Sequence, residues 1–343
     1  MSAKTIYLDY AAATPLHPEV LAAMQPFFAE RFYNPSASYA AARETRKALE
    51  TARADIGHWL GARPSEVVFT AGGSEANNLA VHGVMRQFPQ ANLVVAGVEH
   101  DSILAPAKDY ACRLAKVLPD GRINLENLAE LIDDQTVLVS IGYANNEIGT
   151  IQPLKQIAQL LDEIRNDRRQ RAVKQPLYFH TDACQAGNYL DLHVSRLAVD
   201  LMTINGGKLY GPKQSGVLFV KAGLSLKPLV SGGGQEFGMR SGTENVAAAI
   251  GLAKALNLAQ TDRHNESNRL QQLQRQFFDL IDQTLPNAVI NGSQKTRLPN
   301  NVHLTIPGQD NERLLIQLDE AGIQAAAGSA CSASDEEPSH VLK

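Results

Sequence analysis

The 343-residue sequence has few cysteines, few aromatic residues (6%) and no long apolar run. Its three cysteines, Cys112, Cys184 and Cys331, are an odd set without a CxxC spacing, which indicates neither a disulfide framework nor a zinc site. Residues 1–6 lack the apolar stretch of a signal peptide, and no later segment has about 18 uncharged apolar residues in succession. The sequence therefore predicts a cytoplasmic protein without a membrane segment.

An excess of charge of one sign is also missing. The formal net charge is -4, so no surplus of Lys and Arg is available to neutralise phosphates, which argues against direct nucleic-acid binding. The densest basic run, at 165–174, includes Asp167 and is interpreted as a solvated helix end. With 44% hydrophobic residues the chain has a globular composition, and its length allows two domains.

Short apolar runs alternate with helical segments between residues 60 and 220. The predicted strands lie at 67–70, 93–96, 137–141, 177–180, 201–204 and 217–220. This alternation favours an α/β fold with a mostly parallel sheet covered on both faces. Such sheets bind ligands at the carboxyl ends of their strands.

The two ends of the chain have other patterns. Residues 6–10 are predicted as a short strand or extended arm, followed by helices at 19–29 and 39–60. Beyond a long helix at 244–284, the pattern predicts strands at 288–291, 302–306 and 323–327 and a helix at 311–321. We therefore expect an N-terminal arm (1–15) associated with a small domain, a large domain (16–260) and a smaller α+β domain (261–343).

Lys208 follows the predicted strand at 201–204 and stands between Gly206-Gly207 and a Gly-Pro turn. An amine must lose its proton to attack an aldehyde, and glycines let a flat cofactor approach the backbone. We interpret Lys208 as a lysine that forms a Schiff base. On these residues alone, a surface lysine in a turn is an equal alternative.

Three other strand ends carry residues that suit a phosphorylated aromatic cofactor. Gly73 and Ser74 lie in a glycine turn that leads into a helix, where free N–H groups favour a phosphate, although a helix cap needs no ligand. The His100 ring is placed to lie against a flat cofactor, with a structural histidine as the alternative. Asn146, within 145–149, offers an amide to a carboxylate or ring substituent, with turn formation as the alternative.

Asp182 is the most specific of these residues, because it ends an apolar strand. A buried carboxylate is costly unless it meets a cation, and a protonated pyridine nitrogen is such a partner. Gln185, three residues on, is suited to bond a ring hydroxyl, and Cys184 between them is assigned to packing. Taken in order, a phosphate cradle, a stacking ring, an acid and a lysine indicate pyridoxal 5'-phosphate (PLP).

Two later segments complete the pattern. The glycine-rich loop at 231–243 leads into the long helix, so Arg240 and Thr243 are candidates to meet an anion, including one across a subunit boundary. Cys331 stands among small polar residues at 326–334, where packing explains a cysteine poorly. We interpret Cys331 as a reactive nucleophile on a predicted mobile loop.

With these residues in place, the chain resembles the cysteine desulfurases, the NifS-like branch of the class V aminotransferases, which have the fold type I architecture. The resemblance begins at Tyr7 and covers nearly the whole chain. It rests on the motifs Asn145-Asn146-Glu147-Ile148-Gly149, Asp182-Ala183-Cys184-Gln185, Lys208 with Tyr210-Gly211-Pro212-Lys213, Met239-Arg240-Ser241-Gly242-Thr243 and Gly328-Ser329-Ala330-Cys331.

The resemblance implies a homodimeric PLP enzyme that converts L-cysteine to alanine. Cys331 would take the sulfur as a persulfide and pass it to an acceptor or iron–sulfur scaffold protein, for iron–sulfur cluster assembly or tRNA thiolation. No resident metal is implied; Cys331 would at most share a cluster with an acceptor.

The same resemblance implies a role for each matching residue. Lys208 would hold the cofactor aldehyde, Asp182 the ring nitrogen and Gln185 the ring hydroxyl, while His100 would stack on the ring and move protons. The implied phosphate contacts are Gly73, Ser74, Asn205 and Gly206, with Thr243 reaching the site of the other subunit and Asn146 contacting cofactor or substrate carboxylate.

Three departures from the family pattern leave alternatives open. Gly207 replaces the usual histidine before the lysine, although its N–H would partly replace the lost phosphate contact. Phe237 stands where arginine is frequent, which puts a local ion pair in doubt. The chain stops at Lys343, before the segment in which relatives carry an arginine for the substrate carboxylate. The alternatives are a shortened or catalytically weak relative that acts as a dimeric scaffold, and a selenocysteine lyase or other class V PLP enzyme.

Overall fold

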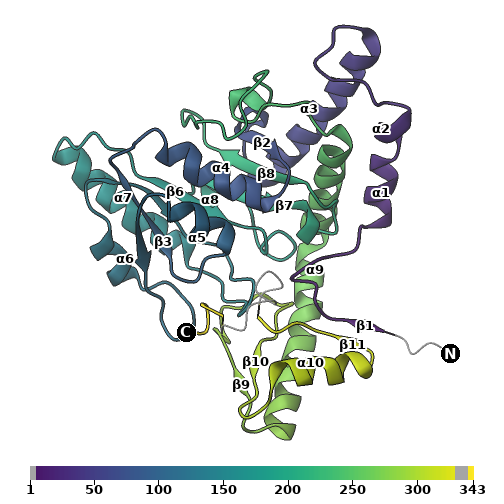
Figure 1. Ribbon diagram of the computed structural model, residues 1–343, viewed down its shortest axis with the longest axis vertical. Helices are drawn as coiled ribbons and strands as arrows, with labels where there is room; N and C mark the ends of the chain where they lie inside the picture. Colours follow the sequence, from purple (N-terminus) through teal and green to yellow (C-terminus); the bar gives the residue numbers. More distant parts are fainter. Residues whose placement is uncertain (1–4, 329–338) are drawn as a thin grey trace.

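A mostly parallel sheet of seven strands forms the centre of the larger, upper lobe (Figure 1). The structure, a computed structural model, describes residues 5–328 and 339–343. The strand order is β2-β8-β7-β6-β5-β3-β4, and β8 runs antiparallel to both of its neighbours. The strands are β2 (Val67–Thr70), β3 (Asn92–Ala96), β4 (Ala111–Ala115), β5 (Thr136–Ser140), β6 (Tyr178–Asp182), β7 (Leu201–Asn205) and β8 (Gly216–Val220). The predicted α/β class with a mostly parallel sheet is confirmed.

All the strands predicted between residues 60 and 220 are present, but β4 was missed. β4 pairs only with β3 in this order, so it forms an edge of the sheet. Its residues Ala111 and Leu114 are exposed and Arg113 is half-buried, so the segment lacks the apolar run of a central strand. The neighbouring β3 is buried along its whole length.

Two cores lie on the two faces of the sheet, because alternate side chains of each strand point to opposite faces. In β3, Val95 packs into the core covered by α4 (Gly73–Met85) and α5 (Asp101–Ala107). The adjacent Val94 packs into the larger core, which includes residues of α3 (Ala40–Leu60), α7 (Leu154–Gln170) and α9. This double cover leaves the carboxyl ends of the parallel strands as the place where polar groups gather.

The predicted helix at 19–29 is interrupted. It consists of α1 (Pro18–Met24) and α2 (Pro26–Ala29), because Pro26 has no N–H to continue the first helix. The remaining short elements of the upper lobe are α6 (Leu125–Leu131), α8 (Val194–Leu197) and the 3₁₀ turns η1 (Pro64–Glu66), η2 (Gly206–Lys208) and η3 (Glu236–Gly238).

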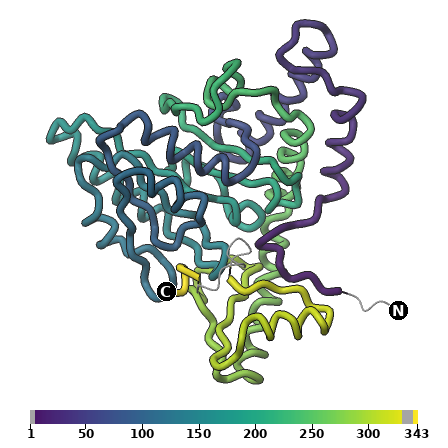
Figure 2. The backbone as a smooth tube through the Cα atoms, viewed as in Figure 1, coloured from purple at the N-terminus to yellow at the C-terminus, as the bar shows by residue number. Residues whose placement is uncertain are grey.

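The long helix α9 (Val246–Thr284) connects the upper lobe to a lower group of short elements (Figure 1). There β9 (Val289–Ile290) pairs antiparallel with β10 (Leu304–Thr305), and α10 (Asn311–Glu320) precedes β11 (Ile323–Gln324). β11 pairs in parallel with β1 (Ile6–Tyr7), so the N-terminal segment runs down to this lower group (Figure 2). The proposed domain boundaries at residues 15 and 260 stay a prediction.

The basic run at 165–174 differs from the expected solvated helix end. Arg168 is buried, and its guanidinium donates to the carbonyl oxygen of Thr136 at 2.9 Å. Burial lowers the pKa of Arg168. This arginine therefore joins the end of α7 to the sheet.

Among the helices that the structure describes, none is both long enough and apolar enough to cross a bilayer.

Candidate active site

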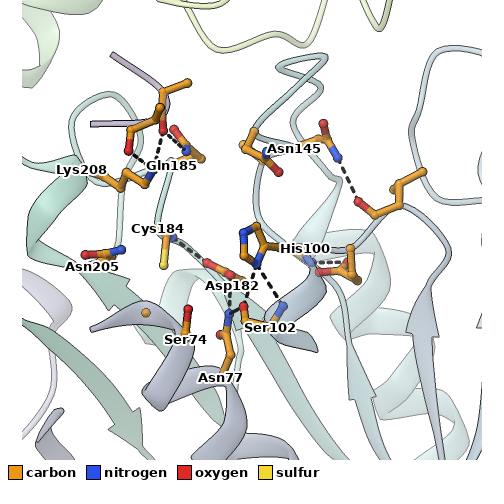
Figure 3. A pocket seen from close by; sticks show the side chains of 18 of the residues that line it. Ser74, Asn77, His100, Ser102, Asn145, Asp182, Cys184, Gln185, Asn205 and Lys208 are labelled. Atoms are coloured by element: carbon orange, nitrogen blue, oxygen red, sulfur yellow. Dashed lines mark hydrogen bonds between the residues drawn. The ribbon is translucent and has the colours of Figure 1, made fainter. Parts of the chain in front are cut away.

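A cavity of about 240 Å³ opens at the carboxyl ends of the parallel strands (Figure 3). Strands β2, β3, β5, β6 and β7 each lead into residues that line it, and the N-terminal segment closes one side with Asp9, Ala11 and Ala12. The lining includes eight residues that the sequence singled out, namely Gly73, Ser74, His100, Asn146, Asp182, Gln185, Asn205 and Lys208. These eight residues, up to 135 positions apart in the sequence, thus lie together at the carboxyl ends of the strands.

The N-terminus of α4 forms one end of this cavity. Gly72, the N-cap, has φ 139°, a backbone conformation that favours glycine. A Cβ atom on Gly73 would lie 2.7 Å from Sγ of Cys184, so only glycine fits there without movement. The first-turn N–H groups of a helix have no acceptor within it, and the Ser74 side chain adds a hydroxyl (Figure 3). This end of the cavity therefore attracts an anion.

Two glycines beside Lys208 have their N–H groups occupied. Gly206 donates to the carbonyl oxygen of Ser215 at 2.9 Å, and it does not line the cavity among the described residues. Gly207 donates to Oδ1 of Asn205 at 3.0 Å. The Gly207 N–H is therefore bound to protein, in contrast to the expectation that it would replace a lost phosphate contact. Asn205 itself lines the cavity.

Lys208 and Gln185 meet at the N-terminal segment. Nζ of Lys208 donates to the carbonyl oxygens of Ala11 and Ala12, both at 2.6 Å. Nε2 of Gln185 donates to the same Ala11 oxygen at 3.0 Å. Figure 3 shows the two side chains next to each other. Main-chain carbonyl oxygens thus hold the amine at the cavity wall, where its charge also interacts with that of Asp9.

Asp182 is fixed by two donors. Its Oδ1 accepts the N–H of Cys184 at 2.8 Å, and its Oδ2 accepts Nδ2 of Asn77 at 2.6 Å. Asn77 was not assigned a role from the sequence, although it lies one helical turn after Ser74. Burial, with the adjacent Asp182 charge, raises the pKa of the Cys184 thiol well above its usual value. Cys184 is therefore a protonated thiol in the cavity wall.

His100 begins α5 as its N-cap residue. Its Nδ1 accepts the backbone N–H of Ser102 at 3.0 Å and lies 2.8 Å from Oγ of Ser102. The same Oγ accepts Nδ2 of Asn77 at 2.8 Å. Ser102 was also missed from the sequence. A His-x-Ser pattern at a helix start is the signal that would have found it.

Glu99 is a further missed residue, a buried acid that lines the cavity. One of its carboxyl oxygens accepts the N–H of Gly142 at 2.8 Å. Burial raises the pKa of Glu99 to about 8, and the charge of Asp182 acts in the same direction. The carboxyl is therefore largely protonated at neutral pH.

The motif at 145–149 contains two asparagines. Oδ1 of Asn145 accepts the N–H groups of Glu147 and Ile148 at 2.9 and 3.0 Å, and its Nδ2 donates to Val98. Asn145 thus builds the turn, as the alternative interpretation of this motif expected. Both Asn145 and Asn146 line the cavity.

Thr243 lies in a second cavity of about 220 Å³, on the other side of the turn formed by residues 70–75. This second cavity is bordered by two ion pairs, Arg240 with Glu75 at 2.9 Å and Arg53 with Glu236 at 2.7 Å. The Phe237 ring lies 5.0 Å from the Arg53 guanidinium. Although Phe237 put a local ion pair in doubt, Glu236 is paired.

Cys331, the predicted nucleophile, lies outside the described residues. Gly328, three positions before it, lines the first cavity.

Known proteins resemble this chain over nearly its whole length. The family model described as aminotransferase class-V matches residues 6–343. A relative from Dictyoglomus turgidum, named cysteine desulfurase IscS, is 38% identical and covers 99% of this chain and 85% of its own. A solved NifS-like protein has a TM-score of 0.89 at 28% identity, over 98% of this chain and 88% of its own. A structure titled SspA in complex with cysteine has a TM-score of 0.83 at 31% identity, over 98% and 93%.

Proposed function

This chain belongs to the class V aminotransferase family, and from that premise we propose that it is a PLP-dependent cysteine desulfurase. One observation carries the proposal: Lys208, Asp182, Gln185 and His100 line a single cavity that ends at the N-terminus of a helix. The relatives named cysteine desulfurase, and the neighbour solved with cysteine, support L-cysteine as the substrate.

The donors and acceptors of the cavity fit PLP. The first turn of α4, with the Ser74 hydroxyl, suits the phosphate, and the Asp182 carboxylate suits a protonated ring nitrogen. Lys208 supplies the amine that binds the aldehyde. A side chain at Gly73 would collide with Sγ of Cys184, so glycine at this position keeps the helix N-terminus open.

When bound, PLP withdraws electrons from the amino acid that it carries, so that the α-proton is acidified and the Cβ–S bond is weakened. Asp182 keeps its charge directed into the cavity because Asn77 and the Cys184 N–H hold its two oxygens. Lys208 and His100 line the same cavity and are the groups that take and return protons.

Cys331 receives the sulfur in this proposal. Its thiolate attacks the substrate sulfur, an S–S bond forms as the Cβ–S bond breaks, and the released carbon takes up a proton to give alanine. Cys331 stands three positions after Gly328 in the sequence, and Gly328 lines the cavity. Cys184 is unsuited to this role because burial raises the pKa of its thiol.

A homodimer and a sulfur-accepting protein partner are part of the proposal. Thr243 lies in the second cavity and not among the described residues of the first, which suits a residue that serves another subunit. The cytoplasmic location expected from the sequence stays a prediction.

The test begins with the absorbance of the purified 343-residue chain after PLP is added. We expect a visible band, borohydride fixation of PLP on the peptide that contains Lys208, and release of alanine and sulfide from L-cysteine with a thiol reductant. Lys208→Ala should lose the band and the turnover, whereas Lys221→Ala, on the surface, should keep both. Cys331→Ser should keep the band and lose sulfur release.

A colourless protein after PLP addition, or a tag on another lysine, would contradict the proposal. Turnover of selenocysteine and cysteine sulfinate, measured beside cysteine, separates the desulfurase from a selenocysteine lyase or another class V enzyme.

A further inference from the structure

We propose that Ser102 and Asn77 are positioning residues, which hold His100 in the tautomer with its hydrogen on Nε2 and couple it to Asp182. This proposal rests on the proposed function, because it assigns how the proton-moving histidine of that site is prepared. The carrying observation is one chain of hydrogen bonds across α4, α5 and β6, which joins Asp182, Asn77, Ser102 and His100.

The direction of each hydrogen bond follows from the chemistry of the amide. Nδ2 of Asn77 carries two hydrogens and accepts none, so it donates one to Asp182 at 2.6 Å and one to Oγ of Ser102 at 2.8 Å. The reverse orientation of the amide would place its oxygen beside the Asp182 carboxylate, with two acceptors facing each other. Asp182 therefore sets the orientation of Asn77.

The serine transmits this orientation to the histidine. Oγ of Ser102 accepts from Asn77, so its single hydrogen is available for Nδ1 of His100 at 2.8 Å. The backbone N–H of Ser102 also donates to Nδ1, at 3.0 Å. A hydrogen on Nδ1 would face both donors, so the ring hydrogen lies on Nε2. Figure 3 shows the ring beside Ser102 and above Asn77.

The arrangement has a cost that packing alone does not explain. Asn77 is buried on α4, and within the described part of the chain its Oδ1 has no hydrogen-bond partner. A buried acceptor without a partner is unfavourable, and an apolar side chain would avoid this penalty. The amide keeps both of its hydrogens for Asp182 and Ser102, which is consistent with a role at the site.

The chain contains a control for the contact between histidine Nδ1 and serine Oγ, at a helix start where the histidine side chain, unlike that of His100, makes no capping hydrogen bond. His193 begins α8, and its Nδ1 lies 2.9 Å from Oγ of Ser195, two residues later, as in the pair of His100 and Ser102. Ser195 is exposed, and neither residue lines the first cavity among the described residues. Ser195→Ala therefore removes the same local contact away from the site.

The first experiment needs no cofactor. In protein labelled with ¹⁵N-histidine, long-range ¹H–¹⁵N spectra distinguish Nδ1 from Nε2 protonation, and His100→Ala assigns the signal. We expect His100 to be the Nε2–H tautomer. Ser102→Ala keeps the main-chain N–H that donates to Nδ1, so it should add a minor Nδ1–H population, and Ser102→Thr should remove that population. Asn77→Ala should add a smaller Nδ1–H population than Ser102→Ala, and Ser195→Ala should leave the His100 signal unchanged.

The second experiment uses the PLP-loaded enzyme. Ser102→Ala should lower kcat about tenfold with little change in KM or in the absorbance band, because the loss affects proton transfer. Ser102→Thr should recover most of the rate. In a His100→Ala background, Ser102→Ala should cause no further loss, since the serine acts through the histidine.

An unchanged His100 tautomer in Ser102→Ala, or an equal tenfold loss in the His100→Ala background, would overturn the role of Ser102. An unchanged His100 tautomer in Asn77→Ala would show that Asn77 does not help to position the histidine. Failure of the wild-type chain to bind PLP or to turn over cysteine would instead refute the proposed function, and the cofactor-free spectra would still report on the network.

Discussion

The two cavities on either side of the 70–75 turn hold their charged groups in different ways. In the first, Lys208 bonds main-chain carbonyls and Asp182 bonds an amide and a main-chain N–H. In the second, Arg53 and Arg240 are bonded to carboxylates. Neutral partners orient a charge without cancelling it, whereas an ion pair uses the charge to hold structure. The comparison thus contrasts charges oriented by hydrogen bonds in the first cavity with ion pairs that border the second. The lining of the second cavity also includes Glu244, whose Oε2 atom lacks a hydrogen-bond partner among the described residues.

The ion pair at the second cavity joins residues that are far apart in the sequence. Arg53 on α3 and Glu236 in the 231–243 loop are 183 positions apart, and the Arg53 guanidinium lies over the Phe69 ring at 4.8 Å. Glu236 and Phe237 have φ of 47° and 58°, an unfavourable region for residues with side chains. The buried ion pair therefore fixes a strained loop against the strand that leads into the 70–75 turn.

Breaking the buried ion pair should have the largest effect. Arg53→Met leaves the Glu236 carboxylate buried without its partner, which should lower the free energy of unfolding by about 3–5 kcal/mol. Urea denaturation measures this loss, and Arg171→Met, on an exposed ion pair, is the control. Arg53→Met combined with Glu236→Leu should recover part of the stability. A loss below that of the exposed pair would contradict the structural role of the second cavity.

Neutralising Asp182 should have the next largest effect, on rate and not on stability. Asp182→Asn removes the charge that pairs with a protonated ring nitrogen, so kcat should fall about 10²- to 10³-fold while the absorbance band persists. Asp162→Asn, at an exposed carboxylate, should keep the wild-type rate. Retained activity in Asp182→Asn would mean that the charge of the first cavity serves the fold, as in the second.

Much of the first cavity could be predicted from the sequence, because parallel strands place their carboxyl ends together. Ser74, His100, Asp182 and Lys208 each follow an apolar run, and these runs are visible in the chain. The phosphate contact expected of Gly206 stays a prediction, and its N–H donates to Ser215 because β7 pairs with β8. That partner depends on the sheet and not on local sequence.

The missed residues depend on the way in which helices lie beside each other. Asn77 and Ser102 are 25 positions apart and meet only because α4 and α5 pack on the same face of the sheet. β4 was missed because Arg113 interrupts its apolar residues. A charged residue is tolerated there because β4 is an edge strand with one open side. The contact between Asn77 and Ser102 has no short-range pattern in the sequence, although the His-x-Ser pattern at 100–102 marks Ser102 itself.

Replacing Glu99 by glutamine should give the smallest effect. The substitution tests whether the first cavity contains an uncharged carboxyl group. Burial raises the pKa of Glu99 from 4.5 to about 8, so stability present at low pH is lost as pH rises towards 8. His180, whose pKa burial lowers to about 4 from 6.5, has the opposite sign, but it is mostly neutral in both states above pH 7. Between pH 7 and 8, Glu99 should therefore cost the wild type about 1 kcal/mol, since the slope of at most about 1.36 kcal/mol per unit falls off near the pKa. Glu99→Gln should abolish this decline in urea denaturation at the two pH values, while exposed Glu163→Gln should retain it. Equal declines in wild type and Glu99→Gln would show that the carboxyl is ionised throughout, and would make this wall of the cavity as charged as the second.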